Sequence, residues 1–259
     1  MLICGMESAR VARDSPVTLG DKAVYSLPGL LLAAVGVPLY VYMPKFYTDV
    51  VGVSAAATGG LILAARLADA ASDPLIGVLS DQTRTRHGRR RPYIALGSLA
   101  LAALLYALYA PPHGPQWLLT AWFGGCLLLL SVAWTLVDVP WESLGPEITH
   151  GYDERTSLFS FREGMTIVGL VLAAASPLLI ERALSLSESA SDQRLKFLVF
   201  GAAYAPLVVA CCWLCVWRIR EPKAESAPAR ERRFWRSWRE TFANRPFRVL
   251  LAAYAVSSV

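Results

Sequence analysis

Charged side chains are missing from five long stretches of the sequence, although Asp, Glu, Lys and Arg make up 17% of the chain. A soluble domain of 259 residues rarely combines 55% hydrophobic residues with charges segregated in this way. The composition therefore excludes an ordinary soluble domain and favours an integral membrane protein. The charge-free stretches are 23–44, 50–65, 92–137, 164–180 and 197–217.

Histidine and cysteine do not form a pattern that is typical of metal or redox chemistry. The three histidines fall in or near predicted loops, and the C-x-x-C pair Cys212 and Cys215 lies inside an apolar stretch without a second ligand pair. We interpret these cysteines as small hydrophobic side chains of a helix. The sequence thus predicts no catalytic residue and no cofactor.

The apolar stretches are long enough for six transmembrane helices, because one span needs about 20 mainly apolar residues. The longest stretch contains the turn PPHGPQ and is divided there into two spans. The predicted fold class is an all-α polytopic membrane protein with a six-helix N-terminal bundle; a large soluble helical bundle is the alternative. The predicted spans are 24–46, 54–79, 92–110, 117–140, 162–182 and 197–217.

Arginine and lysine are distributed unequally between the predicted loops. The loop DQTRTRHGRRR carries five arginines, and residues 218–248 carry ten Lys or Arg. Because basic loops stay in the cytoplasm, these loops and the N-terminus are predicted to be cytoplasmic, in a plasma (inner) membrane. The net charge of +5 is then explained by topology and the lipid bilayer, so no nucleic-acid partner is expected.

The chain is expected to contain four regions. Residues 1–23 form a cytoplasmic N-terminus without a signal peptide, starting at Met1 or Met6, and residues 24–217 form the bundle. Residues 218–246 form a basic cytoplasmic loop, and 247–259 begin a seventh helix that is too short to cross a bilayer. We therefore expect a truncated N-terminal half that lacks a C-terminal partner half.

Two aspartates lie inside the second predicted span. Asp69 and Asp73 are one helical turn apart and Arg66 lies one turn earlier, so the three share one stripe of the helix. An ionised side chain near the bilayer centre costs about 2.5–3.5 kcal/mol on insertion scales, so the stripe is expected to face a polar cavity or partner helices. The alternative is a structural ion pair between Arg66 and Asp69 that only joins helices.

A third acid, Asp138, ends the fourth predicted span. If Asp138 came beside Asp69 and Asp73, three carboxylates would meet, and such a cluster needs a proton or a cation to offset its charge. Oxygen ligands suit hard cations, so Na⁺ is a candidate at Asp69 and Asp73.

Three sequence motifs occur in an order typical of one transporter family. YTDVVGVS, RLADAASDPLIGVLSDQTRTRHGRRRP and DVPWESLGPEITHGYDERTSLFSFRE closely resemble motifs of the glycoside–pentoside–hexuronide cation symporters, which belong to the major facilitator superfamily. The resemblance covers residues from about 20 to 220. It implies symport of a sugar or glycoside-type solute, coupled to Na⁺ or H⁺, between two six-helix halves.

The resemblance also implies roles for particular residues. Asp69, Ser72, Asp73 and Asp138 would contribute to the cation site, with Asp138 between cation and sugar. Arg162 would contact the sugar, and Trp141 lies near the position of a sugar-stacking tryptophan, although an interfacial anchor is the alternative. Ala33 stands where galactoside carriers of the family have an aspartate, which argues against galactoside specificity.

The loop after the second span resembles the superfamily motif that controls conformational change. Gly77 would permit close helix approach, and charge pairs between Asp81 and the arginines would hold one face closed. The alternative is that these arginines only anchor the loop in the cytoplasm. The members of this predicted switch are Gly77, Asp81, Gly88, Arg89, Arg90 and Arg91.

Two other functions remain open from the sequence alone. A lysolipid or another non-sugar solute could be carried by a protein of the same superfamily. A polytopic membrane enzyme with intramembrane aspartates is the second alternative, but the acid-containing motifs of such enzymes are missing from this sequence.

Overall fold

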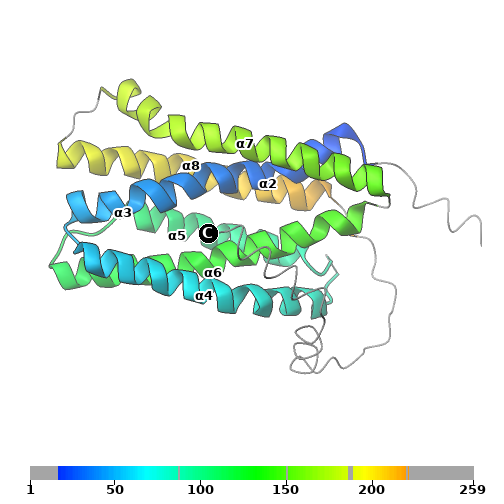
Figure 1. Cartoon of the computed structure of the whole chain (residues 1–259), viewed down its shortest axis with the longest axis horizontal. Coiled ribbons are helices and arrows are strands. Elements are labelled where there is room, and N and C mark those ends of the chain that lie inside the picture. The colour runs from blue at the N-terminus through cyan, green and yellow to red at the C-terminus, as the bar shows by residue number, and fades with distance from the viewer. Residues whose placement is uncertain (1–16, 87, 150, 186–188, 220, 222–259) are drawn as a thin grey trace, which may run out of the picture. The chain divides into compact units, whose positions relative to one another are not determined.

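The computed structural model describes residues 17–86, 88–149, 151–185, 189–219 and 221, and within these ranges it is almost wholly helical (Figure 1). The predicted all-α fold class is confirmed. Residues 1–16, most of the predicted central loop and the predicted seventh helix at 247–259 lie outside the described residues. The elements are α2 (Leu19–Val37), η2 (Pro38–Tyr42), α3 (Met43–Lys45), η3 (Phe46–Val51), α4 (Ala55–Gln82), α5 (Arg91–Tyr109), α6 (Gln116–Ile148), α7 (Tyr152–Ala183) and α8 (Ala190–Arg218).

The first four elements form one continuous helical segment with two wider turns. It begins at a capping box in which the Thr18 hydroxyl accepts from the Asp21 amide at 3.2 Å. The π-helical turns η2 and η3 start at or just after Pro38 and Pro44, where proline removes a backbone donor and loosens the hydrogen-bond ladder. The segment ends at Gly52, whose φ of +90° suits glycine at a helix C-terminus.

Several helices continue beyond the spans predicted from the sequence. α6 passes Pro140 and Pro146 to reach Ile148, and α7 begins at Tyr152, ten residues before the predicted start. The predictions followed charge-free runs, whereas a helix keeps its backbone hydrogen bonds satisfied regardless of where charge begins. The helices therefore extend beyond these two predicted spans at the end of α6 and at the start of α7, while the bounds of the spans stay predictions.

Among the described helical segments, five are long and apolar enough to cross a membrane. They are Leu19–Val51, Arg91–Tyr109, Gln116–Ile148, Tyr152–Ala183 and Ala190–Arg218. α4 is not among them, because its polar residues lower its mean hydropathy. Its 28 residues would nevertheless extend over about 42 Å, which is enough to span a bilayer if the polar side chains are shielded.

The order of the helices in space differs from their order in the chain (Figure 1). α2 packs against α7 on one side and α8 on the other, α5 packs against α8 and α6, and α4 packs against α6. Aromatic side chains fix η3 to these neighbours: the Tyr47 hydroxyl donates to the Leu108 carbonyl at 2.7 Å, and its ring lies 4.2 Å from that of Phe123. α4 and α7 bury only four residues each, so much of the surface of both helices is exposed.

α2 and α7 approach each other most closely at Gly169. A Cβ atom at this position would lie 2.2 Å from the Leu30 carbonyl oxygen, which belongs to the backbone and cannot move aside by a change of rotamer. Glycine is therefore required here by the distance between the two helices. Gly164, on the same helix, has nothing within 4 Å of its Cβ position.

We expect Gly169→Ala to destabilise the protein by about 1–3 kcal/mol, because the added methyl group must separate α2 from α7. Thermal unfolding of the purified protein in detergent measures this change. Gly164→Ala is the matched control and should unfold at or slightly above the wild-type temperature, since alanine favours a helix. Equal stability of the two variants would contradict the close approach at Gly169.

Candidate functional site

Hydroxyl groups of α6 face the two aspartates of α4. The Ser131 hydroxyl donates a short hydrogen bond to the Asp69 carboxylate, and the Thr135 hydroxyl donates to Asp73 Oδ1 at 2.8 Å. Both pairs are separated by one helical turn on their own helix, so α4 and α6 are aligned with matching spacing. This arrangement, which we call the acid–hydroxyl ladder, explains how α4 places its polar stripe against the largely apolar middle of α6.

Ser72 adds a third hydroxyl to the acid–hydroxyl ladder. Its Oγ lies 3.3 Å from Thr135 Oγ1 and the same distance from the Asp69 carbonyl oxygen. The ladder therefore presents two carboxylates and three hydroxyl oxygens, which is the donor set that hard cations prefer.

The expected three-carboxylate cluster is not formed in the part of the chain that the structure describes. No group of three His, Cys, Asp or Glu residues lies close enough there to hold a metal ion. Asp138 instead lines a cleft whose lining includes neither Asp69 nor Asp73. The expectation that Asp138 joins the acid pair in one cluster is therefore corrected.

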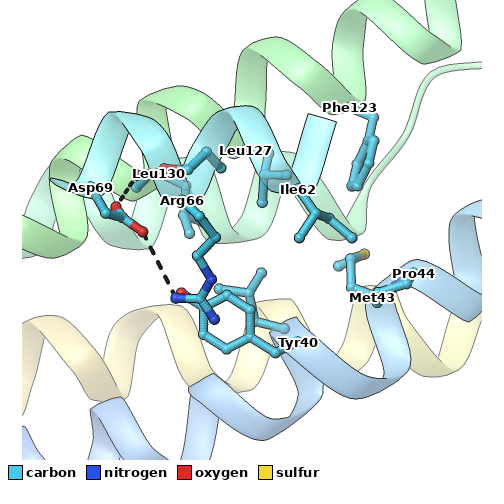
Figure 2. A pocket seen from close by; sticks show the side chains of 12 residues that line it. Tyr40, Met43, Pro44, Ile62, Arg66, Asp69, Phe123, Leu127 and Leu130 are labelled. Atoms are coloured by element: carbon cyan, nitrogen blue, oxygen red, sulfur yellow. Dashed lines mark hydrogen bonds and ion pairs between the residues drawn. The ribbon is translucent and has the colours of Figure 1, made fainter. Parts of the chain in front are cut away.

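Arg66 reaches from α4 toward the first helical segment (Figure 2). Its guanidinium lies 3.9 Å from Asp69 Oδ2 and 4.0 Å above the centre of the Tyr40 ring. The predicted ion pair between Arg66 and Asp69 is present, but it is long and the Arg66 side chain is 54% exposed. Such a pair holds the arginine loosely.

A cleft with a volume of about 470 Å³ opens between α2, α6 and α7. It contains three residues that the sequence proposed for solute binding, namely Asp138, Trp141 and Arg162, and also Ala33. Gly36 of α2 also lines the cleft, where the Trp134 ring lies 3.6 Å from its Cβ position, an ordinary contact distance. A second, mainly apolar pocket lies beside Asp69. Tyr40 lines both this pocket and the cleft, so its side chain separates them.

Trp141 is used mainly for packing. Its indole nitrogen donates to the Tyr25 carbonyl at 2.8 Å, its ring stacks on Tyr25 at 5.5 Å, and only 4% of the residue is exposed. Trp134, which the sequence analysis missed, is less buried and borders the same cleft. Trp134 lies four residues before Asp138 and hence on the same face of the helix. This spacing could have identified it as a cleft residue from the sequence.

Charged residues also meet where α4, α5 and α6 end. Arg90 lies 2.8 Å from Asp81 and 3.2 Å from Glu147, and Arg89 lies 2.5 Å from the same oxygen of Glu147. Arg90 also donates a short bond to the Ser143 carbonyl, and its side chain is only 8% exposed. The structure thus brings together the predicted partners Asp81 and Arg90, and it adds Glu147, which the sequence analysis did not single out.

The first turn of α5 holds a further carboxylate. Glu221 accepts from the backbone amides of Arg89 at 2.5 Å and Arg90 at 2.8 Å, where the positive end of the helix dipole favours an anion. Gly88, with φ of +111°, is essential to this contact, because a Cβ there would lie 1.9 Å from Glu221 Oε2. Arg91 donates to the Val216 carbonyl, which ties the same turn to α8.

Gly77 does not have the role expected from the sequence. A Cβ at this position would lie 3.7 Å from Val139 Cγ1, which is an ordinary contact distance. Close approach between α4 and α6 therefore does not depend on glycine at this position, and this expectation is corrected.

Comparison with known proteins places the geometry in a wider context. A family model described as "MFS/sugar transport protein" matches residues 24–259. An uncharacterized symporter of Synechocystis sp. is 36% identical over 148 residues, which cover 55% of this chain and 27% of that protein. A putative glycoside/cation symporter of Escherichia coli is 35% identical over 156 residues, covering 59% and 33%.

A putative sulfoquinovose importer of Salmonella typhimurium is similar over more of the chain. It is 26% identical over 243 residues, which cover 92% of this chain and 50% of the importer. The chain thus spans half or less of the length of these curated relatives.

We expect Gly88→Ala to open the turn before α5, because the methyl group displaces Glu221 and the backbone conformation is strained by about 1–2 kcal/mol. Trypsin cleavage after the exposed Arg84 and Arg86 should become about 5- to 30-fold faster in the purified protein. Gly151→Ala, in another exposed turn with nothing within 4 Å of its Cβ position, is the control. An unchanged cleavage rate would show that Glu221 does not hold this turn.

Proposed function

The chain belongs to the MFS/sugar transport protein family, among the glycoside–pentoside–hexuronide symporters, and from this membership we propose that it supplies the cation- and solute-binding helices of a cation-coupled sugar symporter. The family and the curated relatives are transporters, so the enzyme alternative is not retained. Its six helical segments form part of an integral membrane protein.

One observation carries this proposal: an oxygen-rich cation site and a polar cleft share a wall. The acid–hydroxyl ladder offers Asp69, Asp73 and hydroxyl oxygens to Na⁺, or a carboxylate to H⁺. Tyr40 borders both the pocket at Asp69 and the cleft that contains Asp138. A cation bound at the acid–hydroxyl ladder can therefore change how a solute fits in the cleft, and the reverse. Such coupling between two sites is what symport requires.

The cation would bind between α4 and α6 without large backbone movement. Ser131 and Thr135 now donate to the carboxylates, and their oxygen lone pairs would turn toward a bound cation while their protons turn away. Arg66, held only by a long contact, would move off Asp69 when the cation takes its place. Asp138 and Arg162 in the cleft would bind the hydroxyl groups of the solute.

Alternating access would depend on the charged network at the helix ends. Asp81, Arg89, Arg90 and Glu147 join α4, α5 and α6, and this network would form in one state and break in the other. Because the chain spans half or less of its relatives, we propose that the opposite wall of the cleft comes from a second six-helix half. The measurements below therefore use the complete transporter that contains this chain.

We expect Asp69→Asn and Asp73→Asn to abolish cation-stimulated uptake, because each removes one charge of the acid–hydroxyl ladder. Thr135→Ala should weaken apparent cation affinity by about 10- to 100-fold, the usual effect of losing a group that orients a ligand. Thr135→Ser keeps the hydroxyl and serves as the matched control.

Uptake of radiolabelled sugars into membrane vesicles, with and without a Na⁺ gradient and at two external pH values, separates Na⁺ from H⁺ coupling. A lysolipid should not be taken up in parallel assays. If both aspartate variants keep normal stimulation by cations, the acid–hydroxyl ladder is structural and the cation site must be sought elsewhere.

The orientation of the helices is a separate proposal, based on the five arginines between α4 and α5. A cysteine introduced at the exposed Gln82 should react with an impermeant maleimide only from the cytoplasmic side of the membrane. A cysteine at Gln116, exposed at the start of α6, should react only from the outside. The reverse pattern would require the opposite topology and an external N-terminus.

A further inference from the structure

The guanidinium group in the cleft is already paired with two carboxylates. Arg162 donates to Glu163 Oε1 through Nη2 at 2.6 Å and through Nε at 3.1 Å, and its Nη1 lies 3.6 Å from Glu142 Oε1. Among the described residues that line the cleft, Arg162 is the one cation, while Asp138, Glu142 and Glu163 are acids. The described wall of the cleft is therefore acidic.

The acids are more accessible than the cation. The side chains of Glu142 and Glu163 are 56% and 58% exposed, whereas that of Arg162 is 19% exposed. Aromatic rings cover part of the guanidinium, since its carbon lies 4.9 Å from the ring centre of Phe159 and 5.7 Å from that of Trp141. A solute that enters the cleft thus meets carboxylate oxygens before it meets the guanidinium.

We propose that this cleft selects uncharged glycosides and discriminates against sugars that carry a carboxylate, with Glu142 and Glu163 as the specificity-determining residues. This inference rests on the proposed transport function and narrows its solute class. Carboxylates accept hydrogen bonds from sugar hydroxyls and have no proton to offer an anion. A uronide would have to displace Glu163 or Glu142 from Arg162 and would still lie near the remaining acids.

The residues that the first helical segment contributes to the cleft also support selection of uncharged glycosides. Gly29, Ala33 and Gly36 are its small residues on the cleft, and none of its described residues that line the cleft is charged. Among the described residues, the charged groups that can recognise hydroxyls therefore come from α6 and α7, where the acids stand on both sides of Arg162. Arg162 holds their carboxylates in place and compensates only part of their charge.

The test compares pairs of sugars, and the two members of each pair share a ring configuration and differ in charge. Methyl β-glucoside and methyl β-glucuronide, and the corresponding galactoside and galacturonide, would compete for uptake of a radiolabelled glycoside by the complete transporter. In the wild type we expect the neutral sugar of a pair to compete at least about fivefold better than its uronide. This is the scale expected for charges that are half exposed.

Removing one negative charge should reduce this discrimination. Glu142→Gln and Glu163→Gln should each lower the ratio of neutral-sugar affinity to uronide affinity by about fivefold, whatever each change does to the binding of both sugars together. Glu181→Gln is the control and should keep the wild-type ratio, because Glu181 lies on α7 outside the cleft and pairs with Lys196 at 3.2 Å. Thermal unfolding of each purified variant in detergent shows that it is folded.

The possible results distinguish the inference from the proposed function. If the wild type transports sugars but accepts uronides as well as neutral glycosides, the specificity inference is wrong and the transport function stands. The same holds if the two glutamate variants behave like Glu181→Gln. If no sugar of either kind is taken up or competes, the proposed function itself fails.

Discussion

The high cost of an ionised carboxylate in an apolar surrounding governs the arrangement of these helices. α4 carries Asp69 and Asp73 on one stripe, and each would cost about 2.5–3.5 kcal/mol if it faced lipid near the bilayer centre. Ser131 and Thr135 on α6 offset this cost by donating hydrogen bonds at the same spacing of one helical turn. The pairing of α4 with α6, and hence the place of the first helical segment beside Arg66, follows from that match.

The structure divides acidic residues between two places, and aromatic side chains keep these apart. Tyr40 receives the Arg66 guanidinium on its ring while it borders the cleft on its other side, so the charges at Asp69 and Asp138 do not merge. A single merged cluster would bind one cation very tightly and leave no acid free for solute hydroxyls. In the proposed function, this separation would keep a reversible cation site and a solute cleft as neighbours, which is a condition for coupling them.

The features that could be predicted from sequence are those set by local spacing. Charge-free runs located the helices, and one-turn intervals placed Arg66, Asp69 and Asp73 on one face. Partners from distant parts of the chain could not be found in this way: Glu147 lies 58 residues from Arg89, and Glu221 lies 131 from Arg90. The burial of Trp141 was also missed, because its packing depends on Tyr25 and on a glycine of α2 that no local pattern connects to it.

The two arginines nearest to the proposed moving parts differ in how firmly they are held. Arg90 is buried, lies against both Asp81 and Glu147, and also donates to the Ser143 carbonyl, so several contacts would have to break together to release it. Arg66 is half exposed and lies 3.9 Å from its acid, an interaction worth about 0–1 kcal/mol. A cation that reaches Asp69 therefore has little to displace there, whereas opening the helix ends needs a larger change in free energy. In the proposed transport function, the weak pair would be the one to exchange with the cation, and the more firmly held pair would be the one to keep the helix ends in one conformation.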